Sequence, residues 1–559
     1  MIQKIIPGLS WLKTYHWTDL RGDLSAGGIV AIMLIPQGMA YAMLAGLPPV
    51  YGLYASTLPL IVYALTGSSK HLAVGPVAMI SLLVFSGISP LAEPNTDQYI
   101  HLVLLLTLMI GGMQFIMGLL KLGFFINFFS HAVISGFTSA AAIIILLSQM
   151  GHLLGIQVVS GHSALHLLKE ILSQIHKTHI LTLAVGLVSL VILLFFKLRS
   201  SRFPAPLLVV ITMTLAAHFS KLDQAGLKVV GNVPKGLPNL SLPQFSVESF
   251  SQLMPVALTV LFVGFMESIS VATWIAAKER YRVDSSEELK GLGLANIVAS
   301  FFSAYPVTGG LSRTAINYEA GARTGLASII SAAVVILTLL FFTPLLYSLP
   351  KASLAAIVIV AVTGLIDFKG AKHLFKIKKN DGWTFLLTFL TTLLLGSEKG
   401  ILIGMVFSLL LFIWRSAHPH LAEIGYLKEE NIFRNIKRYP EVQTFPDTLI
   451  LRIDSSLYFA NMGFLKEYLQ KRLAERPMVK RVILDFSGVN DMDGVAIDSL
   501  EEIIKSYGEK EIHFLFTNVK GPVRDLISKA EWEIKFGRFF HFPTVEHALQ
   551  QIHSGKGER

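Results

Sequence analysis

Residues 73–78 have the sequence Ala-Val-Gly-Pro-Val-Ala, and residues 305–313 have the sequence Tyr-Pro-Val-Thr-Gly-Gly-Leu-Ser-Arg. Each window places proline and glycine inside an apolar stretch, where both residue types weaken a helix. The windows fall in the third and about the tenth apolar segments, which are corresponding positions if seven spans are repeated. Interrupted helices at matching positions of two halves are typical of membrane transporters built as inverted repeats.

The two windows allow two interpretations. A helix that begins inside the membrane exposes free N–H groups and a partial positive charge, so two such N-termini that face each other form an anion site. In the alternative, the windows are proline kinks that only help the helices to pack, because glycine and proline are common in membrane helices. The matching position of the two windows favours the anion site.

The composition indicates a membrane protein with a soluble tail. Of the 559 residues, 53% are hydrophobic and only 15% are charged, against about a quarter charged in soluble proteins. Residues 421–559 hold 41 of the 84 charged side chains, and the 420 residues before them hold only 43. A purely soluble enzyme is therefore excluded. We expect a transmembrane domain over residues 1–420, a linker over 421–435 and a cytoplasmic domain over 436–559.

The apolar segments and the loop charges predict the topology. About 20 apolar residues cross a bilayer, and the charge-poor windows allow about 14 crossings, some of them partial. The first 420 residues have a net charge of +11, and their basic residues lie in every second connection. This alternation predicts a multi-pass protein of the cell (inner or plasma) membrane with both termini in the cytoplasm. No basic stripe with interleaved aromatics predicts a nucleic-acid partner, and the chain has no cysteine for a thiolate metal site.

The tail has the pattern of a small α/β domain. Alternating or short apolar runs predict strands at Thr448–Asp454, Arg481–Phe486 and Glu511–Thr517, and helical periodicity covers Phe464–Arg476 and Gly494–Tyr507. The tail contains neither a glycine-rich phosphate loop nor a nucleophile elbow. The sequence therefore predicts neither an enzyme nor a cofactor or a metal.

Several motifs resemble those of one transporter family. They are Ile-Pro-Gln-Gly-Met-Ala-Tyr-Ala at 35–42, Leu-Pro-Pro-Val-Tyr-Gly-Leu-Tyr-Ala-Ser at 47–56, Glu-Ser-Ile-Ser-Val-Ala at 267–272, and the run 302–317 around the second window. In this order they resemble the sulfate permease (SulP) anion transporters, and Ile-Leu-Asp-Phe-Ser-Gly-Val at 483–489 resembles the STAS domain of that family. The resemblance implies a seven-plus-seven inverted repeat divided into core and gate domains, usually a homodimer, with elevator-like motion of the core.

The resemblance also implies a substrate site, with the anion between the N-termini of the third and tenth helices. Its expected residues are Gln37, Tyr41, Val77, Ala78, Leu311, Ser312 and Arg313. Structural alternatives stay open for three of them. Gln37 could bond a neighbouring helix, Tyr41 could only pack, and Arg313 could be a helix-end residue whose charge reaches the interface.

Glu267 lies in an otherwise uncharged stretch of the eighth span. An ionised carboxylate at that depth costs several kcal/mol unless it is paired or protonated. It could form a permanent ion pair with Arg313, or it could titrate and couple anion entry to a proton gradient, the role of the matching acidic residue in proton-coupled relatives. Sodium binding is the third interpretation and ranks last, because Glu leaves less room than Asp for an ion cage.

The leading functional hypothesis is secondary active transport of a small anion, with sulfate as the default and H⁺ as the symported ion. Bicarbonate or dicarboxylate symport with H⁺ or Na⁺, and a passive anion exchanger or channel, stay open. A membrane sensor that signals through its STAS domain to a cytosolic protein is the hypothesis from another class. Such a sensor would not need an intramembrane carboxylate beside an anion site.

Overall fold

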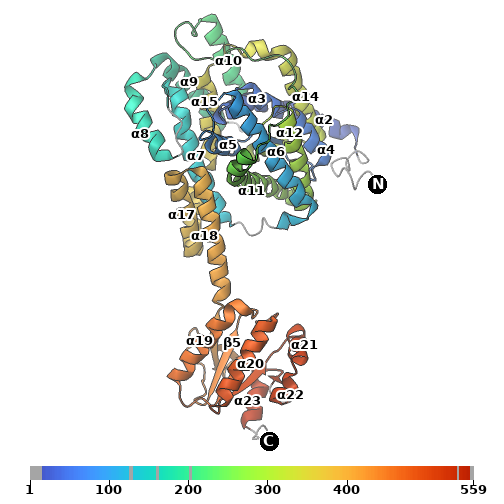
Figure 1. Cartoon of the computed structure of the whole chain (residues 1–559), viewed down its shortest axis with the longest axis vertical. Helices are drawn as coiled ribbons and strands as arrows, with labels where there is room; N and C mark the ends of the chain where they lie inside the picture. The colour runs from blue at the N-terminus through green and yellow to red at the C-terminus, as the bar shows by residue number, and fades with distance from the viewer. Residues whose placement is uncertain (1–14, 125–129, 159–162, 200–203, 538–540, 554–559) are drawn as a thin grey trace. The chain divides into compact units, whose positions relative to one another are not determined.

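The computed structural model describes residues 15–124, 130–158, 163–199, 204–537 and 541–553. The chain divides into two compact units, Met1–Ser408 and Leu409–Arg559. The first contains the apolar helices and the second a sheet with helices, as the ribbon in Figure 1 shows.

Helices make up almost all of the first unit. Its longer helices are α2 (Trp17–Leu44), α6 (Asp97–Leu119), α7 (His131–Leu154), α9 (Ile180–Arg199), α10 (Ala205–Phe219), α11 (Val247–Lys278), α12 (Ser285–Phe301), α17 (Lys379–Leu395) and α18 (Ser397–Ala417), the last of which crosses the unit boundary. Its shorter helices are α3 (Val50–Tyr54), α4 (Leu58–Thr66), α5 (Ala78–Ile88), α8 (Ala164–Gln174), α13 (Leu311–Glu319), α14 (Leu326–Leu337), α15 (Lys351–Val362) and α16 (Phe368–Ile377).

Eight helical stretches among the described residues are long and apolar enough to span a membrane, and three shorter apolar stretches accompany them. A polytopic helical membrane fold is therefore confirmed. The count of about 14 spans and the seven-plus-seven repeat stay predictions, because several apolar helices end after fewer than 18 residues.

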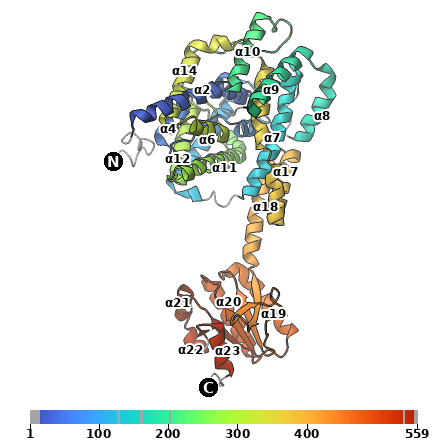
Figure 2. The same ribbon diagram turned by 180° about the vertical axis from the view of Figure 1, so that it is seen from behind.

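Segments from the two halves of this unit pack against each other. α12 packs against α4 and α6, α14 packs against α2, and α15 packs against α7 and α9. Figures 1 and 2 show this from opposite sides, with blue N-terminal helices among the green helices from the middle of the chain.

Two buried carboxylates hold these halves together. Asp23 accepts hydrogen bonds from the backbone N–H groups of Arg323 and Thr324 and from the Thr324 hydroxyl, at 2.7, 3.0 and 2.6 Å. Glu288 accepts from the Tyr63 hydroxyl at 2.7 Å and from the Ser69 backbone N–H at 2.6 Å. Buried carboxylates are tolerated when donors satisfy their oxygens, so these two groups have a clear structural role.

The second unit contains one six-stranded sheet in the order β4-β3-β5-β6-β7-β8. Its strands are β3 (Leu421–Leu427), β4 (Ile432–Asn435), β5 (Thr448–Ile453), β6 (Arg481–Asp485), β7 (His513–Thr517) and β8 (His541–Phe542). Its helices are α19 (Phe459–Glu475), α20 (Gly494–Gly508), α21 (Gly521–Lys529), α22 (Trp532–Phe536) and α23 (Val545–His553). The strands from β5 to β8 are parallel, whereas β3 is antiparallel to both β4 and β5.

The strands and helices expected in the tail are confirmed, with ends that differ by a few residues. Residues 421–435, expected as a linker, form β3 and β4 of the sheet. The alternation of apolar and polar residues in these strands is short, and β4 pairs on one side only, which leaves a weak sequence signal for an edge strand.

A candidate anion site between two broken helices

The two windows lie side by side as short extended segments. β1 (Val74–Gly75) pairs with β2 (Thr308–Gly309) in antiparallel register, with Val74 opposite Gly309. Each strand leads within a few residues into a helix that begins inside the unit, α5 at Ala78 and α13 at Leu311. The windows are therefore chain interruptions that start new helices, and the interpretation as simple proline kinks is wrong.

The first turns of α5 and α13 have backbone donors to offer. Their N-cap residues are Val77 and Gly310, which carry no side-chain acceptor for the N–H groups of the first turn. Such N–H groups, together with the positive end of the helix dipole, favour a negative ligand. α13 is the more accessible of the two, because Leu311 and Ser312 are exposed at its start.

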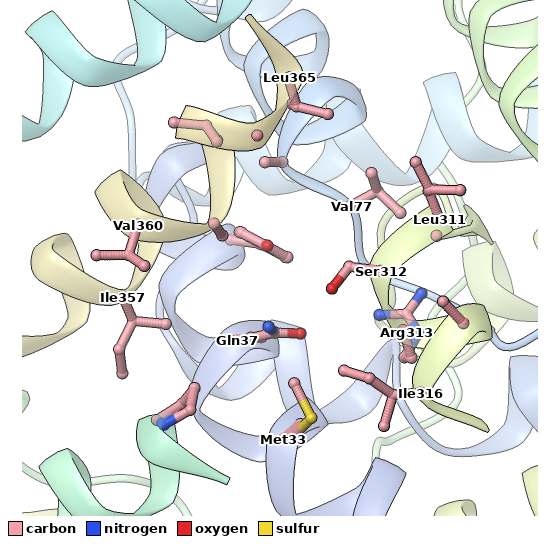
Figure 3. Close-up of a pocket in the computed structure, with 18 of the residues that line it drawn as sticks. Met33, Gln37, Val77, Leu311, Ser312, Arg313, Ile316, Ile357, Val360 and Leu365 are labelled. Atoms are coloured by element: carbon pink, nitrogen blue, oxygen red, sulfur yellow. The ribbon is translucent and has the colours of Figure 1, made fainter. Parts of the chain in front are cut away.

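A cavity of about 450 Å³ opens at these N-termini. All eight residues that the sequence placed in the substrate and coupling site line it: Gln37, Tyr41, Val77, Ala78, Glu267, Leu311, Ser312 and Arg313. Figure 3 shows Gln37, Ser312 and Arg313 around the same open space, with Ile357 and Val360 across from them. The structure thus brings together residues from four helices that are up to 276 positions apart in the sequence.

Gln37 and Tyr41 lie one turn apart on α2, and both are mostly buried. Neither side chain makes a hydrogen bond to another residue in the part of the chain that the structure describes. The alternative role of Gln37, a bond to a neighbouring helix, is therefore not the one this structure contains. Both side chains face the cavity with donor groups to offer.

Arg313 is 4% exposed and joins the two windows. Its guanidinium donates to the carbonyl oxygens of Ala73 at 3.1 Å and Pro76 at 3.0 Å, and more weakly to that of Thr308 at 3.5 Å. Arg313 therefore holds the first window in place from the second. It also brings a positive charge to the cavity wall.

Glu267 of α11 lines the same cavity. Its Oε2 atom is buried without a hydrogen-bond partner, and the carboxylate lies within reach of the Leu311 backbone N–H at the start of α13. Among the described residues, no ion pair joins Glu267 to Arg313, although the two charges are close enough to interact. The structural ion pair that the sequence left open is therefore not formed here.

Polar residues that the sequence analysis did not single out fix the second window. Thr308 donates to the Gly264 carbonyl at 2.6 Å, and Ser268 accepts from the Gly309 backbone N–H at 2.9 Å. Asn296 of α12 bonds both the N–H and the carbonyl of Val307, at 2.8 and 3.1 Å. An Asn inside an apolar helix was a signal that could have predicted this role, because buried amides need partners.

Lys197 of α9 was also missed, and it lines the cavity from the opposite wall. Its ammonium group donates to the Val360 carbonyl at 3.2 Å and to the Thr363 hydroxyl at 3.0 Å, at the end of α15. In the sequence, Lys197 belongs to the basic residues that the loop-charge pattern assigns to a connection. Its position in the last turn of α9, two residues before Arg199, gave no separate signal.

This architecture, with two broken helices at a cavity whose wall carries polar and charged side chains and with a C-terminal α/β domain, defines a membrane anion transporter with a STAS domain. Known sequences and structures lead to the same class. The sequence profile of the Sulfate permease family matches residues 20–388, and that of the STAS domain matches residues 439–548. The chain belongs to the sulfate permease family. It is a transporter, not an enzyme, in agreement with the sequence analysis.

Named relatives match 98% of the chain. Sulfate transporter 4.1, chloroplastic, of Arabidopsis thaliana is 40% identical over 98% of this chain and 82% of its own length. Sulfate transporter 1.3 of the same plant is 34% identical over 98% of this chain and 87% of its own length.

Two solved structures have a fold similar to that of this chain. The murine Solute Carrier 26 family member A9 anion transporter in the inward-facing state has a TM-score of 0.91 at 27% identity, over 99% of this chain and 94% of the other. The transmembrane domain of the cyanobacterial bicarbonate transporter BicA has a TM-score of 0.60 at 22% identity, over 71% of this chain and 98% of the other, and shows a similar fold.

Proposed function

We propose that the protein is a proton-coupled symporter of sulfate. One observation carries the proposal: the same cavity is lined by two helix N-termini and by a carboxylate with a buried, unbonded oxygen. The first feature suits an anion and the second suits a proton. The names of the Arabidopsis relatives support sulfate as the substrate.

The anion would lie between α5 and α13. An anion that leaves water must exchange its hydration for fixed donors, since an unpaired buried charge is costly. Backbone N–H groups at Val77, Ala78 and Leu311 and the Ser312 hydroxyl offer such donors from the two helices. Gln37 and Tyr41 offer donors from α2. Arg313 supplies positive charge, which would act on sulfate as well as on the two backbone carbonyl oxygens that Arg313 already binds.

Glu267 would carry the proton. In its ionised form, the Glu267 carboxylate would compete with the anion for the Leu311 backbone N–H at the start of α13. It would also repel a dianion in the same cavity. Protonation removes that repulsion and leaves the N–H of Leu311 for the substrate. Anion entry and proton uptake then favour each other, and this coupling is what a symporter requires.

The cavity walls suggest how the protein would move. One wall comes from α2, α5, α11 and α13, and the other comes from α9, α10 and α15. We assign these walls to the core and gate domains and propose that the core moves past the gate with the bound anion. We further propose that the protein is a homodimer in the cell membrane with both termini in the cytoplasm. The loop charges support this orientation, and the family resemblance supports the homodimer.

Uptake of radiolabelled sulfate, bicarbonate and succinate into proteoliposomes, with and without an inward proton gradient, tests this function. We expect the gradient to drive accumulation of sulfate above equilibrium. Glu267→Gln should bind sulfate but lose the accumulation. Glu248→Gln is the matched control, because Glu248 lies in the exposed first turn of α11, the helix that carries Glu267, and does not line the cavity.

Three results would contradict parts of the proposal. Full proton-driven uptake by Glu267→Gln would exclude the carrier role of Glu267. A strict sodium requirement in the unmodified protein would replace H⁺ by Na⁺, and accumulation of bicarbonate or succinate instead of sulfate would replace the substrate.

A further inference from the structure

α16 differs in character from the other helices of the membrane unit. None of its residues is buried, although it packs along one side against α17 and α7. It begins at a cap where Asp367 accepts a hydrogen bond from the Gly370 backbone N–H at 2.7 Å. At ten residues it is too short to cross a bilayer, which needs about 20.

Lysines occupy one face of this helix. Lys369, Lys372 and Lys376 follow a spacing of three and four residues, which places them on the same side of a helix. Lys378 and Lys379 continue the run at the junction with α17. All five side chains are exposed, and residues 368–380 contain no acidic residue.

Apolar side chains frame the lysine face. Phe368 is 69% exposed at the start of α16 and Ile377 is 70% exposed at its end. Just beyond, Trp383 of α17 is 57% exposed, and its ring lies edge-on to that of Phe375, with the centroids 5.9 Å apart. Tryptophan at this position is typical of the headgroup region of a bilayer.

We propose that α16 and the following Lys378 and Lys379 bind the headgroups of anionic phospholipids in the plane of the membrane surface. An amphipathic helix with a cluster of four to eight lysines beside a membrane span is the pattern that anionic lipids recognise. The positive-inside rule alone would explain basic residues in a connection, but it requires neither a helical lysine face nor exposed apolar residues at both ends. The expected ligand is a lipid headgroup, and neither a soluble phosphate nor an acidic protein.

The position of α16 gives the binding a consequence for transport. Leu365 lines the cavity only three residues before the helix begins. The intervening Asp367 is tied to α7, because its backbone N–H donates to the Ser139 hydroxyl at 3.1 Å. Lipids that hold α16 at the membrane surface would therefore hold the end of α15 that forms one wall of the cavity.

Retention of lipid by the purified full-length protein is the direct test and does not depend on transport. The protein is equilibrated with equal amounts of phosphatidylcholine and phosphatidylglycerol, and bound lipids are counted by native mass spectrometry. We expect a preference for phosphatidylglycerol that falls on the order of tenfold when the five lysines are changed to Gln. Changing the same five lysines to Arg should keep the preference, because the charge is retained.

The matched control removes the same charge elsewhere. Lys428, Lys437, Lys471, Lys480 and Lys529 are exposed in the second unit, and changing all five to Gln should leave the lipid preference unchanged. Equal retention of the two lipids by the unmodified protein, or an equal loss in both Gln variants, would overturn the proposal.

Uptake provides the second arm. In vesicles of phosphatidylcholine with about one third phosphatidylglycerol, we expect faster sulfate uptake than in pure phosphatidylcholine for the unmodified protein and the control variant, but not for the Gln variant of α16. Faster uptake of the α16 variant in phosphatidylglycerol would overturn the link to the cavity. Because retention is read without transport, a failure of the sulfate proposal leaves the lipid result standing.

Discussion

The two half-helices at the cavity share a geometry but differ in chemistry. α5 and α13 both follow a two-residue strand, and both start at a cap without a side-chain acceptor. The first turn of α5 is apolar and buried, with Ala78 4% and Met79 2% exposed. The first turn of α13 brings Ser312 and Arg313 to the cavity wall.

This difference separates the contribution of the backbone to anion binding from the contribution of the side chains. α5 can offer the anion little more than its N–H groups and helix dipole, because its first side chains are apolar. α13 adds a hydroxyl and a charge, and its Arg313 also positions the carbonyl groups of the window before α5. Changes in α13 are therefore expected to reach further than changes in α5.

Arg313→Gln should have the largest effect. It removes a buried charge whose hydrogen bonds connect the two windows, and breaking a buried charged network costs about 3–5 kcal/mol. We expect a lower midpoint of thermal unfolding and no sulfate uptake. Arg323→Gln, at an exposed arginine after α13, is the control and should change neither. A stable and fully active Arg313→Gln protein would show that the windows hold together without this connection.

Ser312→Ala comes next. Loss of one hydrogen bond to a charged ligand costs about 1.5–3 kcal/mol, which weakens sulfate binding by about tenfold or more at unchanged folding. The hydroxyl of Ser81 in α5 donates to the Val77 carbonyl at 3.0 Å, so Ser81→Ala should leave the affinity unchanged. Calorimetric titration of sulfate into both variants makes the comparison. An equal loss in both would place side-chain recognition on both half-helices.

Gly75→Ala tests the backbone contribution of the first window. Gly75 has φ +153°, a conformation that side chains rarely adopt, and a Cβ there would lie 3.2 Å from the Arg313 guanidinium. We expect a loss of about 1–3 kcal/mol in the free energy of unfolding, read as a lower melting midpoint. Gly310→Ala is the matched change, because its Cβ would lie 3.3 Å from the same guanidinium without a positive φ. Gly310→Ala should lower the free energy of unfolding by less than Gly75→Ala. The reverse order would show that the positive φ of Gly75 does not account for the loss.

The fold class and eight of the residues that line the cavity were within reach of the sequence. Proline and glycine inside apolar stretches marked both windows, and motif resemblance supplied Gln37 and Tyr41 from α2. The pairing of β1 with β2 was out of reach, since two-residue strands leave no periodic pattern. The contacts of Arg313 with carbonyls 237 and 240 positions earlier were also out of reach, because they depend on how distant segments of the chain meet.

Short helices limited how much of the membrane topology the sequence could predict. α5, α13 and α15 are too short to be separated from long spans by hydropathy, so the number of crossings could not be fixed from composition. Lys197 had the sequence context of a loop charge, and only its bonds to Val360 and Thr363 place it in the cavity wall.

Leu311→Ala should have the smallest effect and gives the sharpest test of the comparison. Leu311 is the first residue of α13, as Ala78 is of α5, so the substitution gives both half-helices the same first side chain. Its side chain is 50% exposed, and removing it creates little buried cavity, whereas its backbone N–H stays in place. We expect sulfate affinity within about threefold of the unmodified protein, in line with surface substitutions of about 0.5 kcal/mol. A tenfold loss in calorimetric titration, at an unchanged melting midpoint, would mean that α13 recognises the anion through the Leu311 side chain as well as through its N–H group.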